Sequence, residues 1–235
     1  HGWLPHCFTV SGTGSLERLP AFAEGRFMVQ DAAAHLVTVV AGPQKGDRVQ
    51  DVCAAPGGKS FAAAIAMEGE GQILSCDIHP HKLKLIENGA ARLGLCSIRT
   101  AQADGRERHE AWIGQADLVV ADVPCSGLGI IRKKPDIRYK NLTELEQLPP
   151  LQKKILEVQS RFVRPGGVLL YSTCTVLKRE NEDVVSAFLA VHGEFTTEPL
   201  PLPDVFPKNE TGMLTLIPGE YDTDGFFICR LRRKA

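Results

Sequence analysis

No stretch of this 235-residue sequence is apolar over the roughly 20 consecutive residues that a membrane-spanning helix needs. Residues 1–10 contain no charged segment followed by an apolar one, so we expect no signal peptide there. The seven cysteines include no Cys-x-x-Cys pair, and their odd number does not suit a disulfide framework. We therefore expect a cytoplasmic protein that holds no metal and touches no membrane, with most of its cysteines buried as free thiols.

A basic excess is also missing, because 27 Lys and Arg residues face 28 Asp and Glu residues and the formal net charge is −1. Proteins that bind nucleic acids unaided usually carry a positive surplus, since phosphate contacts dominate their affinity. Positive charge is concentrated in residues 132–140, whose basic side chains are Arg132, Lys133, Lys134, Arg138 and Lys140. Such a run is typical of a solvated loop, but it follows a cysteine motif described below, and we expect it to contact nucleic-acid phosphates.

From residue 48 onward the sequence alternates between strand-like and helix-like segments. The alternation predicts strands at residues 48–53, 72–78, 97–103, 116–123 and 167–173, and helices at residues 59–67, 83–93, 150–163 and 180–191. A last strand at residues 225–232 is expected to run antiparallel to the others, after a Pro-rich loop at residues 196–222. This order of strands and helices predicts an α/β fold with a mainly parallel sheet and helices on both faces.

The length of the chain suits one large α/β domain, which we place at residues 46–235. Residues 1–45 form a segment that leads into this domain and contains one predicted helix, at residues 31–41. In the helix at residues 180–191, the spacing of Val184, Phe188 and Val191 predicts that all three point inward.

Reactive or acidic residues follow five of the predicted strands at the point where each strand ends. They are Cys53, Asp77, Asp104, Asp122 with Cys125, and Cys174. In open α/β sheets, ligands bind beyond the carboxyl ends of the strands. One acidic residue at such a place is ordinarily a turn former or a helix cap. Five strand ends that are each followed by a reactive or acidic residue together predict a ligand site.

The turn after the first predicted strand indicates what kind of ligand binds. Glycines at positions 57 and 58 let the backbone approach a ligand closely. The turn is no Walker A loop, because Cys53 stands where that motif needs glycine, and it is no G-x-G-x-x-G motif. Asp77 follows Gly58 by 19 residues, the spacing at which a carboxylate accepts hydrogen bonds from ribose hydroxyls. The combination predicts a cofactor with a nucleoside but no pyrophosphate, and a plain glycine turn with a capping aspartate is the alternative.

Three strings of residues resemble the signature motifs of the RNA cytosine-5 methyltransferases: DVCAAPGGK at 51–59, DVPCSG at 122–127 and YSTCT at 171–175. Further elements that resemble this family lie at residues 25–31, 132–136, 180–181 and 224–227, so the resemblance runs from about Leu19 to the C-terminus. Within the family, the chain is most similar to the bacterial enzymes that act on small-subunit (16S) ribosomal RNA, the Sun/Fmu-like group. Those enzymes carry an additional N-terminal RNA-binding domain, and we expect this chain to be their catalytic domain.

The resemblance implies a Rossmann-like methyltransferase fold with a seven-stranded sheet, dependent on S-adenosylmethionine. It assigns to Cys174 the role of nucleophile, whose thiolate adds to C6 of cytosine, and to Cys125 the release of the product. It places S-adenosylmethionine against Cys53, Ala54, Ala55, Pro56, Gly57, Gly58, Lys59, Asp77, Asp104 and Asp122.

Individual roles in the cofactor site also come from the resemblance. Asp77 is expected to hold the ribose hydroxyls, and Asp104 is expected to lie near the adenine amino group. Asp122 is expected between the methionine part of the cofactor and the cytosine ring, where it can hydrogen-bond the base edge. Lys59 is expected to help form the cofactor pocket or to hold Asp77 and its neighbours by charge. The target base has to be unpaired or flipped out to reach such a site.

We expect a monomer that modifies 16S ribosomal RNA, and transfer RNA is an alternative substrate. A non-catalytic RNA-binding factor in ribosome assembly is a second hypothesis, which the presence of both cysteines opposes because binding alone needs neither thiol. An enzyme that binds nucleoside phosphates is opposed by Cys53 in the Walker position. Methylation of DNA is opposed by Cys174, because the nucleophile of the DNA enzymes lies in the Pro-Cys element.

Overall fold

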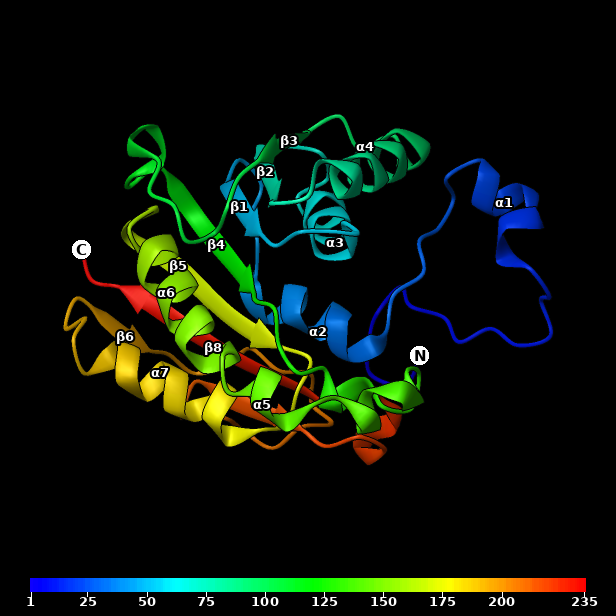
Figure 1. Cartoon of the computed structure of the whole chain (residues 1–235). Helices are drawn as coiled ribbons and strands as arrows, with labels where there is room; N and C mark the ends of the chain where they lie inside the picture. The colour runs from blue at the N-terminus through cyan, green and yellow to red at the C-terminus, as the bar shows by residue number, and fades with distance from the viewer.

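An open sheet with helices packed on both of its faces forms the body of the computed structural model (Figure 1). The structure describes residues 1–235, apart from the side chains of Leu142 and Glu144. The strands are β1 (Arg48–Val52), β2 (Gln72–Asp77), β3 (Ile98–Gln102), β4 (Ala116–Asp122), β5 (Val163–Thr173), β6 (Phe195–Thr197), β7 (Met213–Leu216) and β8 (Phe226–Arg233). Every strand predicted from the sequence is present, so the predicted α/β class is confirmed.

The sheet has eight strands in seven positions. The order is β3-β2-β1-β4-β5-β8-β6, and β7 also pairs with β8. Strands β1 to β5 are parallel, and β8 runs antiparallel to β5, as predicted for the last strand. Since β5 occupies one edge of β8, the short strands β6 and β7 share the other edge in succession. The predicted seven-stranded sheet is confirmed in this sense, with two strands in its last position.

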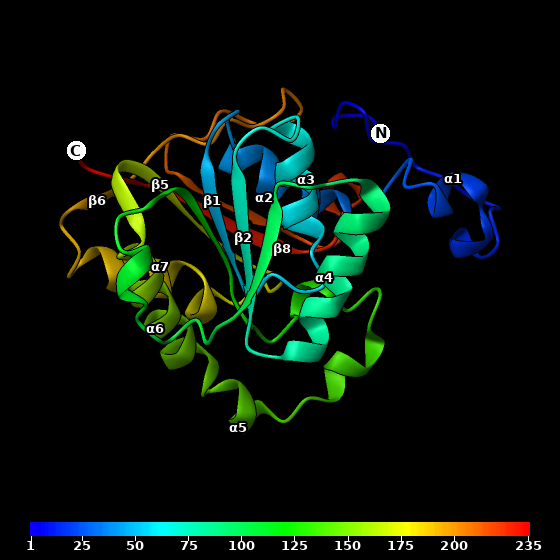
Figure 2. The same ribbon diagram turned by 90° about the horizontal axis from the view of Figure 1, so that it is seen from above.

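The helices are α1 (Pro20–Ala23), α2 (Ala32–Ala41), α3 (Gly58–Ala66), α4 (Pro80–Leu93), α5 (Leu142–Leu145), α6 (Leu148–Ser160) and α7 (Glu182–Leu189). Helices α2, α3 and α4 cover one face of the sheet, and α6 and α7 cover the other (Figures 1 and 2). Neighbouring residues of one strand face opposite cores: Leu118 of β4 packs into the first and Val119 into the second. Sheet strands buried on both faces explain the near-continuous apolar runs of the sequence.

Short 3₁₀ helices complete the chain: η1 (Leu16–Arg18), η2 (Glu110–Trp112), η3 (Leu128–Ile130), η4 (Pro135–Tyr139), η5 (Lys178–Glu180) and η6 (Glu220–Asp222). Residues 1–45 therefore hold α1 and η1 in addition to the one predicted helix, which is α2 with Asp31 as its N-cap. None of the described helices is both long and apolar enough to cross a membrane.

Three expectations from the sequence were wrong. The segment 196–222 is not only a loop, because it contains most of β6 and all of β7, whose pairing depends on the distant strand β8. Val191 is 76% exposed rather than inward, because α7 ends at Leu189 and the helical spacing no longer applies. All seven cysteines are free thiols, but only Cys76 and Cys229 are buried.

Candidate active site at the carboxyl edge of the sheet

The sequence-predicted site residues meet at one edge of the sheet. Asp77 and Asp122 are the last residues of β2 and β4, and Cys53 and Cys174 directly follow β1 and β5. Because these four strands are parallel neighbours, their carboxyl ends lie side by side. Asp104 follows the next strand, β3, at the same edge.

The two cysteines of the candidate motifs are in direct contact. The Sγ atoms of Cys125 and Cys174 are 3.2 Å apart, and the backbone N–H of Cys174 donates to Cys125 Sγ at 3.3 Å. The hydrogen bond from Cys125 lowers the pKa of Cys174 despite its burial, and the positive charge of Lys59 acts in the same direction. The same hydrogen bond, together with burial, raises the pKa of Cys125 well above its usual value. The arrangement therefore favours a thiolate at Cys174 and a thiol at Cys125.

A third cysteine at this edge has a different environment. Burial and the surrounding carboxylates, Asp122 first among them, raise the pKa of Cys53 to about 12. Cys53 is therefore a neutral thiol at physiological pH, unsuited to nucleophilic attack.

The charge beside the cysteine pair comes from a half-enclosed ion pair. Lys59 Nζ lies 2.6 Å from Asp122 Oδ2, with 14% of the lysine side chain and 26% of the aspartate side chain exposed. Burial opposes the charge of Lys59, but the neighbouring Asp122 raises the pKa of the lysine above its usual value. Ser172 Oγ donates to the other oxygen, Asp122 Oδ1, at 2.7 Å. Among the described residues, the ion pair of Lys59 is with Asp122 and not with Asp77.

The turn between β1 and α3 is shaped by two conformational requirements. Cys53 and Gly57 both have positive φ angles, 58° and 109°. A Cβ atom on Gly57 would lie 2.5 Å from Cζ of Phe61, so only glycine fits this position. The helix that begins at Gly58 directs its first free amide N–H groups toward the same edge as the cysteines.

The carboxylates of Asp77 and Asp104, both predicted to bind the cofactor, differ in how many hydrogen bonds they already accept within the protein. Among the described residues, only the backbone N–H of His79 donates to the buried carboxylate of Asp77, at Oδ1 and 3.0 Å. Asp77 Oδ2 is therefore free to accept hydrogen bonds from a ligand. Both oxygens of Asp104 instead accept from Arg106, which lowers the pKa of Asp104. A ligand amino group at Asp104 would have to share the carboxylate with this arginine.

A buried pair of residues, Glu180 and Asn181, fastens the loops that carry the two cysteines. Glu180 Oε2 accepts from the backbone N–H of Ser126 and from Gln152 Nε2, both at 2.9 Å. Because Ser126 follows Cys125, these bonds position the first cysteine. Gln152 also donates to Pro124 O at 3.0 Å, on the other side of Cys125.

Asn181 serves the second cysteine in the same way. Its Oδ1 accepts from Thr173 Oγ1 at 2.6 Å, and its Nδ2 donates to Thr175 O at 3.0 Å. These two threonines flank Cys174. A further bond, from Ser126 Oγ to Thr175 Oγ1 at 2.7 Å, ties the two loops to each other.

The basic segment after Cys125 is partly occupied within the protein. Lys133 Nζ lies 2.6 Å from Asp31 and 2.7 Å from the buried Asp224, and Arg132 pairs with Asp222 at 3.2 Å. These ion pairs join the start of α2, the loop after β4 and the segment before β8. The side chains of Lys134 and Arg138 make no ion pair with any described residue. The expected contact with phosphates therefore fits these two residues better than Arg132 and Lys133.

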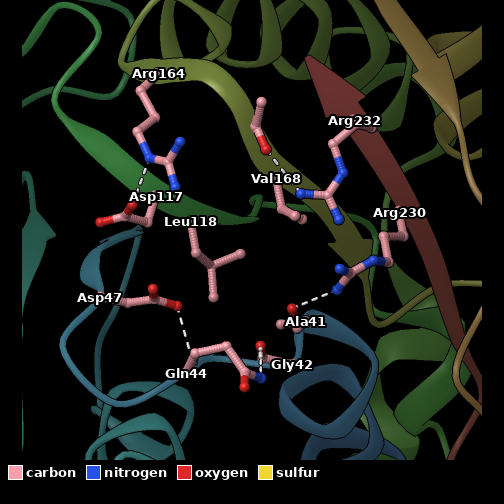
Figure 3. Close-up of a pocket in the computed structure, with 11 residues that line it drawn as sticks. Ala41, Gly42, Gln44, Asp47, Asp117, Leu118, Arg164, Val168, Arg230 and Arg232 are labelled. Carbon is pink, nitrogen blue, oxygen red and sulfur yellow. Dashed lines mark hydrogen bonds and ion pairs between the residues drawn. The ribbon is translucent and has the colours of Figure 1, made fainter. Parts of the chain in front are cut away.

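A cavity of about 330 Å³ lies at the opposite edge of the sheet and is not part of this site (Figure 3). It is lined by the segment between α2 and β1, by the start of β4 and by parts of β5 and β8, and Asp117 pairs there with Arg164. Two further arginines that line it, Arg230 and Arg232, both pair with Glu198. Its positive charges are thus matched within the protein, and none of the predicted site residues lines it.

A family model described as "16S rRNA methyltransferase RsmB/F" matches residues 38–232. The chain belongs to this family. The match covers every candidate site residue above, and it confirms the resemblance that the motifs indicated.

Relatives and solved structures agree with the family. A Bacillus subtilis protein named "Probable ribosomal RNA small subunit methyltransferase B" is 39% identical over 227 residues, covering 94% of this chain and 51% of that protein. A Synechocystis protein of the same name is 38% identical over 238 residues, covering 98% of this chain and 53% of its own length. The chain thus spans about half the length of the curated relatives it matches.

The crystal structure of NSun6 from Pyrococcus horikoshii with SFG has a TM-score of 0.84 and 30% identity, covering 94% of this chain and 56% of that one. The predicted Rossmann-like methyltransferase fold is confirmed by this similarity. Sequence reasoning missed the residues that hold the site residues in place. It did not single out Ser172 and Gln152, and it gave no role to Glu180 and Asn181. Their only signal was the position of the Glu-Asn pair shortly after Cys174.

Proposed function

We propose that this chain binds S-adenosylmethionine and transfers its methyl group to C5 of a cytosine in RNA, with 16S ribosomal RNA as the substrate. We further propose that it acts as a monomer in the cytoplasm. The observation that carries the proposal is the pair of cysteines 3.2 Å apart, one with a lowered and one with a raised pKa. An RNA-binding factor without turnover would need neither the contact nor the difference in pKa.

The residues at the sheet edge fit the proposed cofactor. Asp77 offers a buried, free carboxylate oxygen for ribose hydroxyls, and residues 53–58 offer a turn with close backbone approach. Asp122 and Lys59 lie between this turn and the cysteine pair, which suits the boundary between cofactor and base. When bound, S-adenosylmethionine supplies an electrophilic methyl group.

The first step falls to Cys174. Its thiolate adds to C6 of cytosine, which places electron density on C5 and makes that carbon nucleophilic. Lys59 stabilises the thiolate by its charge, and Asp122 is placed to hold the base edge while Ser172 and Lys59 fix its own orientation.

The last step falls to Cys125. Once Cys174 is bonded to C6, its sulfur carries no negative charge, which removes the largest cause of the raised pKa of Cys125. Cys125 can then release its own thiol proton to solvent and, as a thiolate, accept the proton from C5. The electrons of that C–H bond restore the ring double bond, and the bond between C6 and Cys174 Sγ breaks.

We also propose that residues 46–235 are the catalytic domain and that residues 1–45 lead into it. Helix α2 of the leading segment packs Leu36, Val37 and Val40 against the sheet, which supports a continuous connection between the two parts.

Transfer of labelled methyl groups from S-adenosylmethionine to three nucleic acids tests the proposal: 16S ribosomal RNA, transfer RNA and cytosine-containing DNA. We expect label in 16S RNA, and digestion should place it in 5-methylcytosine. Label in transfer RNA alone would reassign the substrate. Binding of RNA without any transfer, in the presence of bound S-adenosylmethionine, would favour the non-catalytic factor.

A further inference from the structure

The 3₁₀ helix η4, at residues 135–139, is anchored directly on the loop that carries Cys125. Ile137 is buried, and its Cδ1 lies 3.2 Å from where a Cβ of Gly127 would be. Next to it, Lys140 Nζ donates to Ser126 O at 2.7 Å. The position of η4 is therefore tied to residues one and two places after Cys125.

The residues between these two anchors face outward. Tyr139 is 81% exposed, one of the most exposed large side chains of the described chain. The guanidinium of Arg138 lies 5.9 Å from the centre of the Tyr139 ring, and Arg138 Nε donates to Pro135 O at 3.0 Å. The ring of Tyr139 is thus open to solvent on a segment that is fixed to the Cys125 loop, with a guanidinium beside it.

The chemistry of this surface suits single-stranded nucleic acid. An aromatic ring offers a stacking face to any base, and adjacent cations offer contacts to the phosphates on either side. Lys134 and Arg138 supply such cations on the same short segment, while Lys133 is held by Asp31 and Asp224. Figure 2 shows the segment between β4 and α5 lying beyond the carboxyl edge of the sheet, on the side of the candidate site.

We propose that Tyr139 stacks on an unpaired RNA base close in sequence to the target cytosine, with Arg138 and Lys134 at the neighbouring phosphates. This inference rests on the proposed function. Since η4 is fixed to the Cys125 loop, the stacked base would set the distance between the bound strand and the two cysteines. The contact would also help to hold the strand while the target base enters the site unpaired.

The test compares Tyr139→Ala and Tyr139→Trp with the wild-type chain. Affinity is measured for single-stranded RNA with one cytosine and for RNAs that carry one abasic position on either side of it. Loss of a stacked base weakens binding roughly 5- to 150-fold, so we expect a loss of that size for Tyr139→Ala. Tyr139→Trp should retain wild-type affinity, because tryptophan also stacks. Phe8→Ala is the matched control, since Phe8 is a large aromatic residue that is 84% exposed and lies in the N-terminal segment.

The abasic RNAs separate stacking from a general loss of contact. One abasic position should weaken wild-type binding but have little further effect on Tyr139→Ala, because the base and the ring lose the same interaction. S-adenosylmethionine affinity should be equal in all variants. If the wild type methylates RNA while Tyr139→Ala binds it equally well, the stacking proposal is wrong and the proposed function stands. If the wild type binds no RNA, both are wrong.

Discussion

The two cysteines in contact differ in pKa, which is lowered for Cys174 and raised for Cys125. The hydrogen bond between the two thiols is the largest cause of both shifts, and the positive charge of Lys59 also lowers the pKa of Cys174. In the proposed mechanism, this asymmetry lets one thiol start the reaction and the other end it, because alkylation of the first changes the pKa of the second.

Removing each cysteine should therefore stop the reaction at a different point. Cys174→Ala should neither methylate RNA nor form a covalent adduct, because nothing adds to C6. Cys125→Ala should add to the base and methylate it but fail to release it, leaving protein attached to RNA. Labelled RNA on a denaturing gel distinguishes the two, with the exposed Cys96→Ala as a control that behaves like wild type. An adduct from Cys174→Ala, but none from Cys125→Ala, would reverse the assignment.

Asp77 is the residue on which cofactor affinity should depend most. Asp77→Ala removes a carboxylate that is expected to accept bonds from ribose hydroxyls, and it should weaken S-adenosylmethionine binding by about 1.5–3 kcal/mol. Asp77→Asn keeps an oxygen acceptor and should lose less. Calorimetry on both variants checks this order, and an unchanged affinity for Asp77→Ala would place the ribose elsewhere.

At the scale of elements, the geometry of the site depends on the junction where 3₁₀ helix η5 ends and helix α7 begins. Glu180 and Asn181 stand at this junction and are fully buried. Glu180 accepts from the backbone N–H of Ser126, next to Cys125, and Asn181 binds the Thr173 hydroxyl and the Thr175 carbonyl on either side of Cys174. The cysteines lie in loops that follow different strands, so their contact requires a third element that binds both loops. The start of α7 performs this role.

Asn181→Ala should consequently lower the free energy of unfolding and disturb the cysteine pair. It leaves the Thr173 hydroxyl and the Thr175 carbonyl buried without a partner, which costs about 1–3 kcal/mol. Urea unfolding measures the loss, with Asp183→Ala on the exposed face of α7 as a control that should change little. The alkylation rate of Cys174 gives a second readout, because loss of the Cys125 contact raises the pKa of Cys174. Equal stability of both variants would show that the Asn181 bonds are unimportant.

At the scale of the whole molecule, one buried group makes stability depend on pH. Asp51 is 1% exposed, Ser60 Oγ donates to its Oδ2 at 2.6 Å, and its Oδ1 has no partner among the described residues. Burial is the largest cause that raises the pKa of Asp51, to about 7. In the unfolded chain the pKa is about 4. Between these values the folded protein holds a proton that the unfolded chain has released.

The free energy of unfolding should thus fall as pH rises from about 4 to about 7, because the folded state binds more protons over this range. Asp51→Asn cannot ionise, so its free energy of unfolding should not show this fall. Relative to the wild type, the variant should therefore become more stable by a few kcal/mol as the pH rises from about 4 to about 7. Urea unfolding of both proteins at several pH values measures the difference. Parallel curves for the two proteins would mean that Asp51 is already ionised in the folded state.

Much of the fold could be predicted because its signals are local. Apolar runs, glycine turns and helical spacing depend on neighbouring residues, and they placed the strands and most helices near their observed positions. The edge that gathers Asp77, Asp122 and Cys174 followed as well, since parallel strands bring their carboxyl ends together. Short strands such as β7 were missed because four residues carry little pattern and their pairing partner is distant.

The sequence alone determined which chemical groups stand at the site, because its motifs specify residue types at strand ends. Only the tertiary structure decided how those groups pair. Lys59 meets Asp122 across 63 residues of chain, Cys125 meets Cys174 across 49, and Lys133 meets Asp31 across 102. Such pairings depend on distances of a few ångströms between segments far apart in sequence. Packing sets those distances, and no local pattern contains them.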